Sequence, residues 1–408
     1  MLPVEESKRF NESRRNFLAW GAFSFAAFLI NGPRTPLFAA DVQAHPLFAN
    51  PAALGELGAP DAHGLRLLPG FRSRIIARSG RAVLQSTVLP ATEYLWHNSP
   101  DGGATFATSD GGWIYVSNSE VHVAEGGGGV GAVRFNAAGE IIAAYSILSG
   151  TDNNCAGGKT PWQTWLSCEE VDRGLVWECD PFGVKPGVAL PALGRFKHEA
   201  VAVDPINSHL YLTEDEVDGG FYRFIPANAL PDLSAGTLQI AEVVAKGATR
   251  HIVWHDVPDS SASTTRTSMQ VPAASHFNGG EGIAWTEGLV YFTTKGDNRV
   301  WRFDITTSQI DVIYDFASAT HPHLNGVDNI TITASGDVLV AEDGGDMQII
   351  LLGPDGLVLP VVQITGQSES EICGPAFDPA FQYLYFASQT GPTNKPEDGI
   401  LYEISYSH

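Results

Sequence analysis

Residues 210–214 read LYLTE, a short apolar segment that ends in a carboxylate. Five other segments share its pattern of apolar residues followed by a polar turn: Ile114–Asn118 (IYVSN), Thr164–Cys168 (TWLSC), Val290–Thr294 (VYFTT), Val338–Glu342 (VLVAE) and Leu384–Ser388 (LYFAS). Aligned on Tyr115, Trp165, Tyr211, Tyr291, Leu339 and Tyr385, the successive spacings are 50, 46, 80, 48 and 46 residues. A repeat of about 40–50 residues built from short strands is typical of a β-propeller. The sequence therefore predicts an all-β fold with six blades.

Each predicted blade has up to four strands. The third unit shows the full pattern: His198–Asp204, Leu210–Glu214, Phe221–Ile225 and a fourth strand near Leu238–Ala245. The last unit has only three strands, because the chain ends soon after Ile400–Ile404. We expect the early strand Phe71–Arg78 to supply the missing fourth strand, because this leaves no open sheet edge. The spacing of 80 requires an insertion, which we place at about residues 227–278.

The N-terminus carries an export pattern. Arg14 and Arg15 precede an apolar run from Phe17 to Ile30, as in a twin-arginine signal. As a helix this run would extend about 21 Å, short of the roughly 30 Å hydrocarbon core of a membrane. We expect residues 1–40 to be a Tat-type signal peptide, 41–65 an irregular lead-in, and 66–408 the propeller. The predicted location is periplasmic or secreted, with the Tat export machinery as a partner.

The charge of the chain excludes some partners. A formal net charge of −22 and a pI near 4.8 argue against nucleic acid or an anionic membrane as the main partner. Such an excess of carboxylates is commonly a solvated acidic surface. Where carboxylates cluster with glycine and asparagine, they indicate hard cations such as calcium.

Four cysteines are too few to form a disulfide scaffold for 408 residues. Cys168 and Cys179 are eleven residues apart on neighbouring predicted strands and could pair outside the cytoplasm. Cys155 would then be free for another role.

Acidic residues recur where the inner strands of a propeller begin, at one mouth of the central channel. Ten to fourteen residues before the aligned positions stand Cys155, Glu199, Glu281, Asp328 and Glu371. The turns after the second strands form another ring that contains Asn118, Glu120, Glu169, Glu170, Glu214, Asp215, Lys295, Glu342 and Asp343. Carboxylates packed around one axis repel each other unless protons or cations neutralise them. Oxygen ligands suit Ca²⁺, whereas a thiolate among them favours iron or zinc.

Each of these residues also has a simpler interpretation. Acidic residues at strand ends often cap turns, as in Glu342-Asp343-Gly344-Gly345. A single cysteine such as Cys155 is often only a small buried side chain. The agreement of position across the units favours the metal ring over these alternatives.

Several segments together resemble the PhoX-type alkaline phosphatases: Asn154-Cys155-Ala156-Gly157-Gly158, Thr160-Pro161-Trp162, Cys168-Glu169-Glu170, Gly194-Arg195-Phe196-Lys197-His198-Glu199 and Gly326-Val327-Asp328-Asn329. The resemblance runs from about residue 60 to the end. It implies a Tat-exported six-bladed propeller that hydrolyses phosphomonoesters with iron and calcium, with a cysteine on iron. It makes Cys155, Glu199 and Glu281 iron-side ligands, and it lets Asn118, Glu120, Glu169, Glu214 and Asp215 hold the remaining metals.

The chain departs from the longer members of that family. Ser119 stands where they have a histidine in the first-blade turn, and their last-blade histidine has no counterpart near Gln389-Thr390. No motif locates the basic group that binds the phosphate, and Lys295 and Arg195 are the candidates.

The leading hypothesis is a monomeric phosphatase acting on a small phosphorylated substrate. The alternatives are a calcium-dependent propeller hydrolase of lactones or esters, and a non-catalytic, metal-stabilised propeller that binds a partner.

Overall fold

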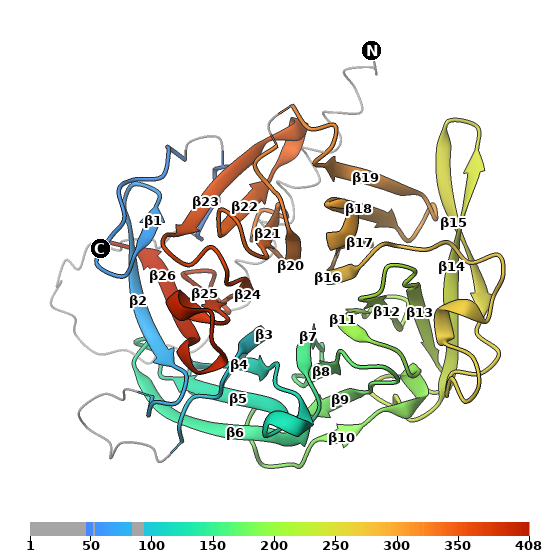
Figure 1. Cartoon of the computed structure of the whole chain (residues 1–408), viewed down its shortest axis with the longest axis horizontal. Coiled ribbons are helices and arrows are strands. Elements are labelled where there is room, and N and C mark those ends of the chain that lie inside the picture. The colour runs from blue at the N-terminus through green and yellow to red at the C-terminus, as the bar shows by residue number, and fades with distance from the viewer. Residues whose placement is uncertain (1–45, 52–53, 84–93, 321, 408) are drawn as a thin grey trace, which may run out of the picture. The chain divides into compact units, whose positions relative to one another are not determined.

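The computed structural model describes residues 46–407 except 52–53, 84–93 and 321, so the predicted signal peptide lies outside the described residues. Six antiparallel sheets are arranged around one axis as the blades of a propeller (Figure 1). The predicted fold class is confirmed.

The strands of each blade follow one another outward from the axis, apart from two additions described below. The bounds are β3(Pro100–Ala107), β4(Trp113–Ser119), β5(Gly128–Phe135) and β6(Ile141–Thr151) in blade one; β7(Asn154–Lys159), β8(Trp165–Glu169), β9(Val176–Cys179) and β10(Val188–Ala189) in blade two; β11(His198–Asp204), β12(His209–Glu214), β13(Phe221–Pro226), β14(Gly236–Lys246) and β15(Thr249–Asp256) in blade three. They continue as β16(Gly280–Thr286), β17(Leu289–Thr294), β18(Arg299–Asp304) and β19(Ile310–Asp315) in blade four; β20(Val327–Ile332), β21(Val338–Glu342), β22(Gln348–Leu352) and β23(Val358–Ile364) in blade five; β24(Ile372–Phe377), β25(Tyr383–Ser388) and β26(Ile400–Tyr406) in blade six.

The helical elements of the described residues are single turns of 3₁₀-helix: Val123–Glu125, Pro191–Leu193, Thr267–Met269, Lys295–Asp297, Pro354–Gly356, Gly391–Thr393 and Pro396–Asp398. No helix in the described part of the chain has the length and apolar character needed to cross a membrane.

The ring closes through the N-terminal strand, as predicted. β2 (Phe71–Arg78) pairs antiparallel with β26 and completes blade six, so strands from both ends of the chain form one sheet (Figure 1). A second early strand, β1 (Leu65–Leu67), pairs with β23 and adds a fifth strand to blade five. The lead-in is therefore tied to two neighbouring blades.

The long spacing in the repeat reflects an extension of blade three. β14 and β15 form a hairpin that extends the blade to five strands, and the chain then returns through an irregular segment to β16. Ser275 and Phe277 of this returning segment form backbone hydrogen bonds with Ala241 and Gly219 respectively. The predicted insertion thus contains an extra strand as well as loop.

The hydrophobic core is divided among the interfaces between blades. Six clusters of buried residues each join two adjacent blades; Tyr211 and Phe292, for example, belong to the cluster between blades three and four. Trp165 and Trp301 also lie in such clusters. Because each blade buries its two faces against its neighbours, the position of each inner strand is set by packing on both sides.

The suggested Cys168–Cys179 disulfide is not formed, and both thiols are free. The register of β8 and β9 explains this correction, since Cys168 pairs with Val176 and Cys179 pairs with Trp165. The two cysteines lie three positions apart along the ladder and pack in different inter-blade clusters.

Candidate metal centre

Six equivalent residues stand where the inner strands begin. In each blade the first paired residue of the inner strand lies opposite the last residue of the second strand, as Asn154 lies opposite Glu169. The next residue of the inner strand lies at an irregularity in the ladder register in every blade. We call these residues the inner ring: Asp101, Cys155, Glu199, Glu281, Asp328 and Cys373.

The inner strands approach each other closely, and the residue following the inner ring is glycine or alanine in five of the six blades. These residues are Gly102, Ala156, Ala200, Gly282, Asn329 and Gly374. A Cβ on Gly102 would lie 2.5 Å from the Ala156 Cα, and one on Gly282 would lie 2.6 Å from the Ile330 backbone nitrogen. The crowded axis therefore brings the inner ring side chains together.

Ligand atoms of the inner ring and its neighbours form four overlapping groups. The atoms within each group lie within 4.8 Å of one another: Asp101, Glu120 and Cys155; Asp101, Glu371 and Cys373; Cys155, Glu170 and Glu199; and Glu199, Glu281 and Asp328. The structure thus brings together six of the predicted site residues, Glu120, Cys155, Glu199, Glu281, Asp328 and Glu371. Glu170, which the sequence placed in the turn ring, joins them, and Asp101 and Cys373 are additional members.

A sequence signal for the two additional residues did exist. Asp101 stands 14 residues before Tyr115, and Cys373 stands 12 before Tyr385, so both fall in the interval that located the other inner ring residues. Within that interval Glu371 and Cys373 are both possible ligands, and only the strand register shows that Cys373 is the equivalent of Cys155.

Three of the residues that end the second strands are carboxylates that cap turns. Glu169 accepts hydrogen bonds from the backbone nitrogens of Asp152 (3.1 Å) and Leu175 (3.0 Å). Glu342 accepts hydrogen bonds from the backbone nitrogens of Asn325 and Gln348, at 2.9 Å each. Glu214 accepts from the Gly220 nitrogen and the Tyr222 hydroxyl. These three residues, which the sequence predicted as metal ligands, cap turns of their own blades, and none belongs to the four groups. This agrees with the simpler interpretation that acidic residues at strand ends cap turns.

The residue after each of these positions forms an outer ring at the mouth. Its members are Glu120, Glu170, Asp215, Lys295, Asp343 and Gln389. Their backbone nitrogens make equivalent hydrogen bonds to the start of the inner strand, as Glu170 does to the Asn153 carbonyl and Lys295 to the Gly279 carbonyl. Because this hydrogen bond recurs in every blade, the outer ring residues of successive blades lie around the same axis.

Asn118 has a positioning role that the sequence interpretation missed. Its amide donates to the carbonyls of Cys155 (2.9 Å) and Ala156 (2.7 Å), and its oxygen accepts from the Trp165 indole. Thr213 and Thr293 occupy the equivalent place and donate to the carbonyls of Glu281 and Asp328. A side chain of one blade thus fixes the backbone that carries the inner ring residue of the next.

Burial and mutual repulsion disfavour negative charge in the inner ring. Burial, reinforced by neighbouring carboxylates, raises the pKa of Cys155, Glu199 and Cys373 well above their usual values. Burial and the charge of Glu120 raise the pKa of Glu170 to about 9. The Cys155 thiol donates to Glu199 Oε1 at 3.2 Å, while Glu199 Oε2 is buried with no hydrogen-bond partner among the described residues. A bound cation would satisfy that oxygen and remove the repulsion.

Lys295 is the cation that the structure places beside the inner ring. Its Nζ lies 2.8 Å from Glu281 Oε1 and 3.5 Å from Asp343 Oδ2. Although burial alone would lower the pKa of Lys295, the facing carboxylates Glu281 and Asp328 raise it, so the side chain is protonated.

Arg195, the second predicted phosphate ligand, lies in a neighbouring pocket. Its guanidinium donates to the Arg173 carbonyl at 3.2 Å. The two candidates therefore belong to different parts of the mouth.

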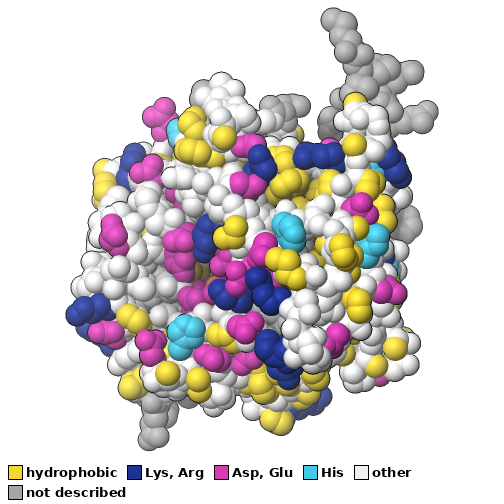
Figure 2. Space-filling model, turned by 45° about the vertical axis from the view of Figure 1, so that its right-hand side comes forward, with side chains coloured by type: hydrophobic (Ala, Val, Ile, Leu, Met, Phe, Trp, Pro, Cys, Tyr) yellow, Lys and Arg dark blue, Asp and Glu magenta, His cyan; other side chains and the backbone are white. Residues whose placement is uncertain are grey.

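The mouth is an open hollow with mixed charge. A cavity of about 450 Å³ is lined by Glu120, Asn153, Glu170 and Lys197, among others. Figure 2 shows acidic and basic side chains gathered around a depression in this side of the molecule. The hollow has room for a small anionic molecule beside the inner ring.

The adjacent residues Glu169 and Glu170 test the difference between carboxylates that cap turns and carboxylates that belong to the four groups. We expect Glu169→Ala to lower the free energy of unfolding by about 1–3 kcal/mol, because two backbone N–H groups lose their acceptor. We expect Glu170→Ala to leave stability without metal nearly unchanged and to weaken metal binding about tenfold or more. Denaturant unfolding in chelator and calorimetric titration with Ca²⁺ and Fe²⁺ measure the two effects. If Glu169→Ala weakened metal binding and Glu170→Ala lowered the free energy of unfolding instead, this division of the two residues would be wrong.

The chain was compared with known protein families and structures. The family described as "Alkaline phosphatase PhoX" matches residues 126–313. No curated protein sequence matches the chain. Among solved structures, Pseudomonas fluorescens PhoX in complex with vanadate, a transition state analogue, superposes with a TM-score of 0.68 at 17% identity, over 86% of this chain and 98% of that one.

A protein of unknown function from Bacteroides thetaiotaomicron gives a TM-score of 0.50 at 9% identity, over 83% of this chain and 76% of the other. These structural likenesses concern the fold. The family match covers the segment that holds Cys155, Glu170, Glu199 and Glu281. The resemblance seen in the sequence is thus confirmed: residues 126–313 match the family of the PhoX-type alkaline phosphatases, which are phosphoric monoester hydrolases.

Proposed function

We propose that this chain hydrolyses phosphomonoesters at a metal centre formed by the inner ring at the mouth of the channel. The observation that carries the proposal is the convergence of buried thiols and carboxylates in four overlapping groups, with Glu199 Oε2 left without a hydrogen-bond partner among the described residues. Burying so many acidic groups is unfavourable unless cations neutralise them. The relation to a phosphatase family supplies the reaction class.

The donor sets suit two kinds of ion. The groups that contain Cys155 or Cys373 combine a thiol with carboxylates, which suits a transition metal such as iron. Glu199, Glu281 and Asp328 provide only oxygen atoms, which suits calcium. Glu199 belongs to both kinds of group, so it would help to hold either ion. When bound, such cations supply Lewis acidity to phosphoryl oxygens.

The side chains around these groups orient and hold the reactants. Gln389 donates to Asp101 Oδ2 (2.7 Å) and Glu120 Oε2 (2.6 Å), which fixes two carboxylates of the first blade. Protonated Lys295 provides a positive charge beside Glu281 for the phosphate of the substrate. Lys295 would add its charge to that of the bound cations and so favour an anionic substrate in a protein of net charge −22.

Replacement of the thiol tests the metal centre. We expect Cys155→Ser to lower hydrolysis of p-nitrophenyl phosphate at least about a hundredfold and to reduce bound iron, because a hydroxyl is a poor ligand for a soft ion. Elemental analysis and chelator-sensitive turnover are the measurements. Cys168→Ser is the matched control, since Cys168 is buried in the core between blades two and three and should retain metal. Full activity and iron content in Cys155→Ser, or calcium alone with no turnover in the native protein, would refute the proposal.

Lys295 can be tested separately from the metals. We expect Lys295→Met to lower kcat/KM for p-nitrophenyl phosphate about a hundredfold while the metal content stays the same, because a positive charge on the phosphoryl group is lost. Lys295→Arg, which keeps the charge, should recover most of the activity. Equal activity of native and Lys295→Met protein would remove Lys295 from the mechanism.

Export through the Tat pathway is also part of the proposal. The support is the Arg14-Arg15 pair followed by a short apolar run. We expect replacement of both arginines by lysine to leave the protein in the cytoplasm of an expressing bacterium, because the Tat pathway reads this pair. Cell fractionation measures the outcome, and replacement of Arg34 is the control. Unchanged export of the double variant would contradict Tat targeting.

A further inference from the structure

A second pocket adjoins the proposed metal centre. It has a volume of about 220 Å³ and lies between the turn after β8, the segment that leads into β11, and the returning segment of the blade-three insertion. Asp172 and Lys197 line both this pocket and the hollow at the mouth. The two cavities are therefore neighbours that share a wall.

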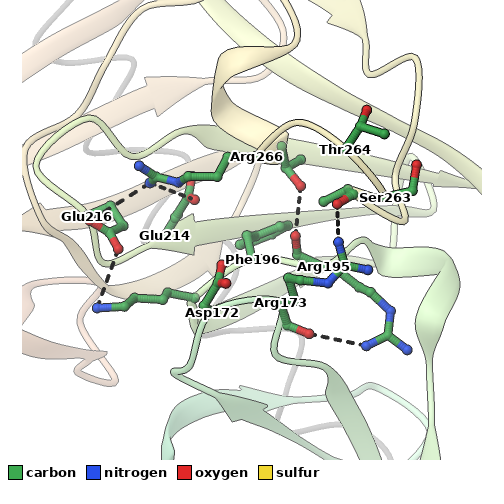
Figure 3. Close-up of a pocket in the computed structure, with 12 residues that line it drawn as sticks. Asp172, Arg173, Arg195, Phe196, Glu214, Glu216, Ser263, Thr264 and Arg266 are labelled. Carbon is green, nitrogen blue, oxygen red and sulfur yellow. Dashed lines mark hydrogen bonds and ion pairs between the residues drawn. The ribbon is translucent and has the colours of Figure 1, made fainter.

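The pocket has two halves that differ in how their positive charges are paired. In one half the positive charges are balanced: Arg266 lies 3.7 Å from Glu214 and 3.8 Å from Glu216, and Lys197 lies 3.4 Å from Glu216. The other half contains Arg173 and Arg195 below Ser263 and Thr264 (Figure 3). Neither of these arginines forms an ion pair within the described part of the chain.

Backbone contacts hold the two unbalanced guanidinium groups in the pocket. Arg195 donates to the carbonyl of Arg173, and Arg173 donates to the carbonyl of Ala262. The backbone carbonyl of Arg195 in turn accepts from Thr267 of the insertion, at 2.8 Å. Each guanidinium has five N–H donors, so most remain available for another acceptor. The insertion thus builds a wall that orients both arginines.

Four basic residues, Arg173, Arg195, Lys197 and Arg266, line the pocket with three acidic ones, Asp172, Glu214 and Glu216, which is an excess of positive charge in a protein of net charge −22. An anion bound between Arg173 and Arg195 would be attracted by both guanidinium groups. Phosphate matches the planar fork of donors on a guanidinium and accepts paired hydrogen bonds from it.

We propose that this pocket is a subsite for a second phosphate group on the substrate, which makes bisphosphorylated molecules the favoured substrate class. The proposal rests on the proposed phosphatase function of the neighbouring metal centre. One phosphate occupies the mouth beside Lys295, and the other binds Arg173 and Arg195. Hydrolysis forms a bond from phosphorus to the oxygen of water and breaks the bond to the ester oxygen, which leaves as a hydroxyl after taking up a proton. The second phosphate remains on the leaving group and holds it during the reaction.

Alkanediol bisphosphates of increasing chain length, compared with the corresponding monophosphates, test the subsite. The metal-loaded protein should show a kcat/KM at least about tenfold higher for the bisphosphate at the best chain length, equivalent to about 1.4 kcal/mol. Arg173→Gln and Arg195→Gln should each reduce this ratio, and the double variant should bring it to about one. Arg81→Gln, which changes an exposed arginine outside the pocket, is the control and should keep the ratio.

The outcomes separate the subsite from the phosphatase function. Turnover of both substrates with no preference at any chain length, or a preference that persists in the double variant, would overturn the subsite alone. Absence of turnover for either substrate would refute the proposed function. In that case, calorimetric binding of the bisphosphate decides the subsite: tighter binding to the native protein than to the double variant supports it, and equal binding rejects it.

Discussion

The starts of six inner strands meet at one axis, and this constraint governs the chemistry of the whole molecule. Five of the six residues next to the inner ring are glycine or alanine, and at the three glycines a Cβ would meet the neighbouring strand at less than 3.0 Å. The inner ring side chains consequently occupy a small common volume in which four are carboxylates and two are thiols. Without cations, burial raises the pKa of these groups and suppresses the charged forms that bind metal. The geometry of the fold therefore brings together the groups that form the proposed metal centre.

The propeller supports this site by distributing its core among the interfaces between blades. Each interface has its own cluster of buried residues, so every inner strand is held from both sides. Polar bonds refine the same arrangement, as Asn118 of blade one holds the carbonyl of Cys155 in blade two. Positioning across blade boundaries means that a ligand's location depends on a residue far from it in sequence. The closing pair of β2 and β26 fixes the last boundary.

The insertion in blade three changes the surroundings of the site without changing the ring. Its returning segment reaches back to the residues that precede β11, where Thr267 binds the backbone of Arg195. Arg195 consequently belongs to the wall of a side pocket, whereas Lys295 lies beside the inner ring. In the proposed function, metal binding and recognition of the rest of the substrate therefore belong to different structural elements.

The sequence by itself determined the repeat, the number of blades, the closing strand and five of the residues that converge at the axis, because these depend on spacing along the chain. Cys155, Glu199, Glu281 and Asp328 were found by counting back from the aligned residues, and Glu371 was found in the same interval. Counting could not separate neighbouring residues. Glu169, the last residue of β8, caps a turn, while Glu170, the first residue after the strand, joins the four groups.

Only the tertiary structure distinguished neighbours such as Glu169 and Glu170. The register of each blade and its contact with the next blade determine which side chain reaches the axis. It also placed Arg195 beside Arg173 and Ala262, which are distant in sequence and meet through packing of the insertion. The same limit applies to the cysteines. Their spacing allowed a Cys168–Cys179 bond, whereas the ladder register keeps both thiols apart in different layers of the core.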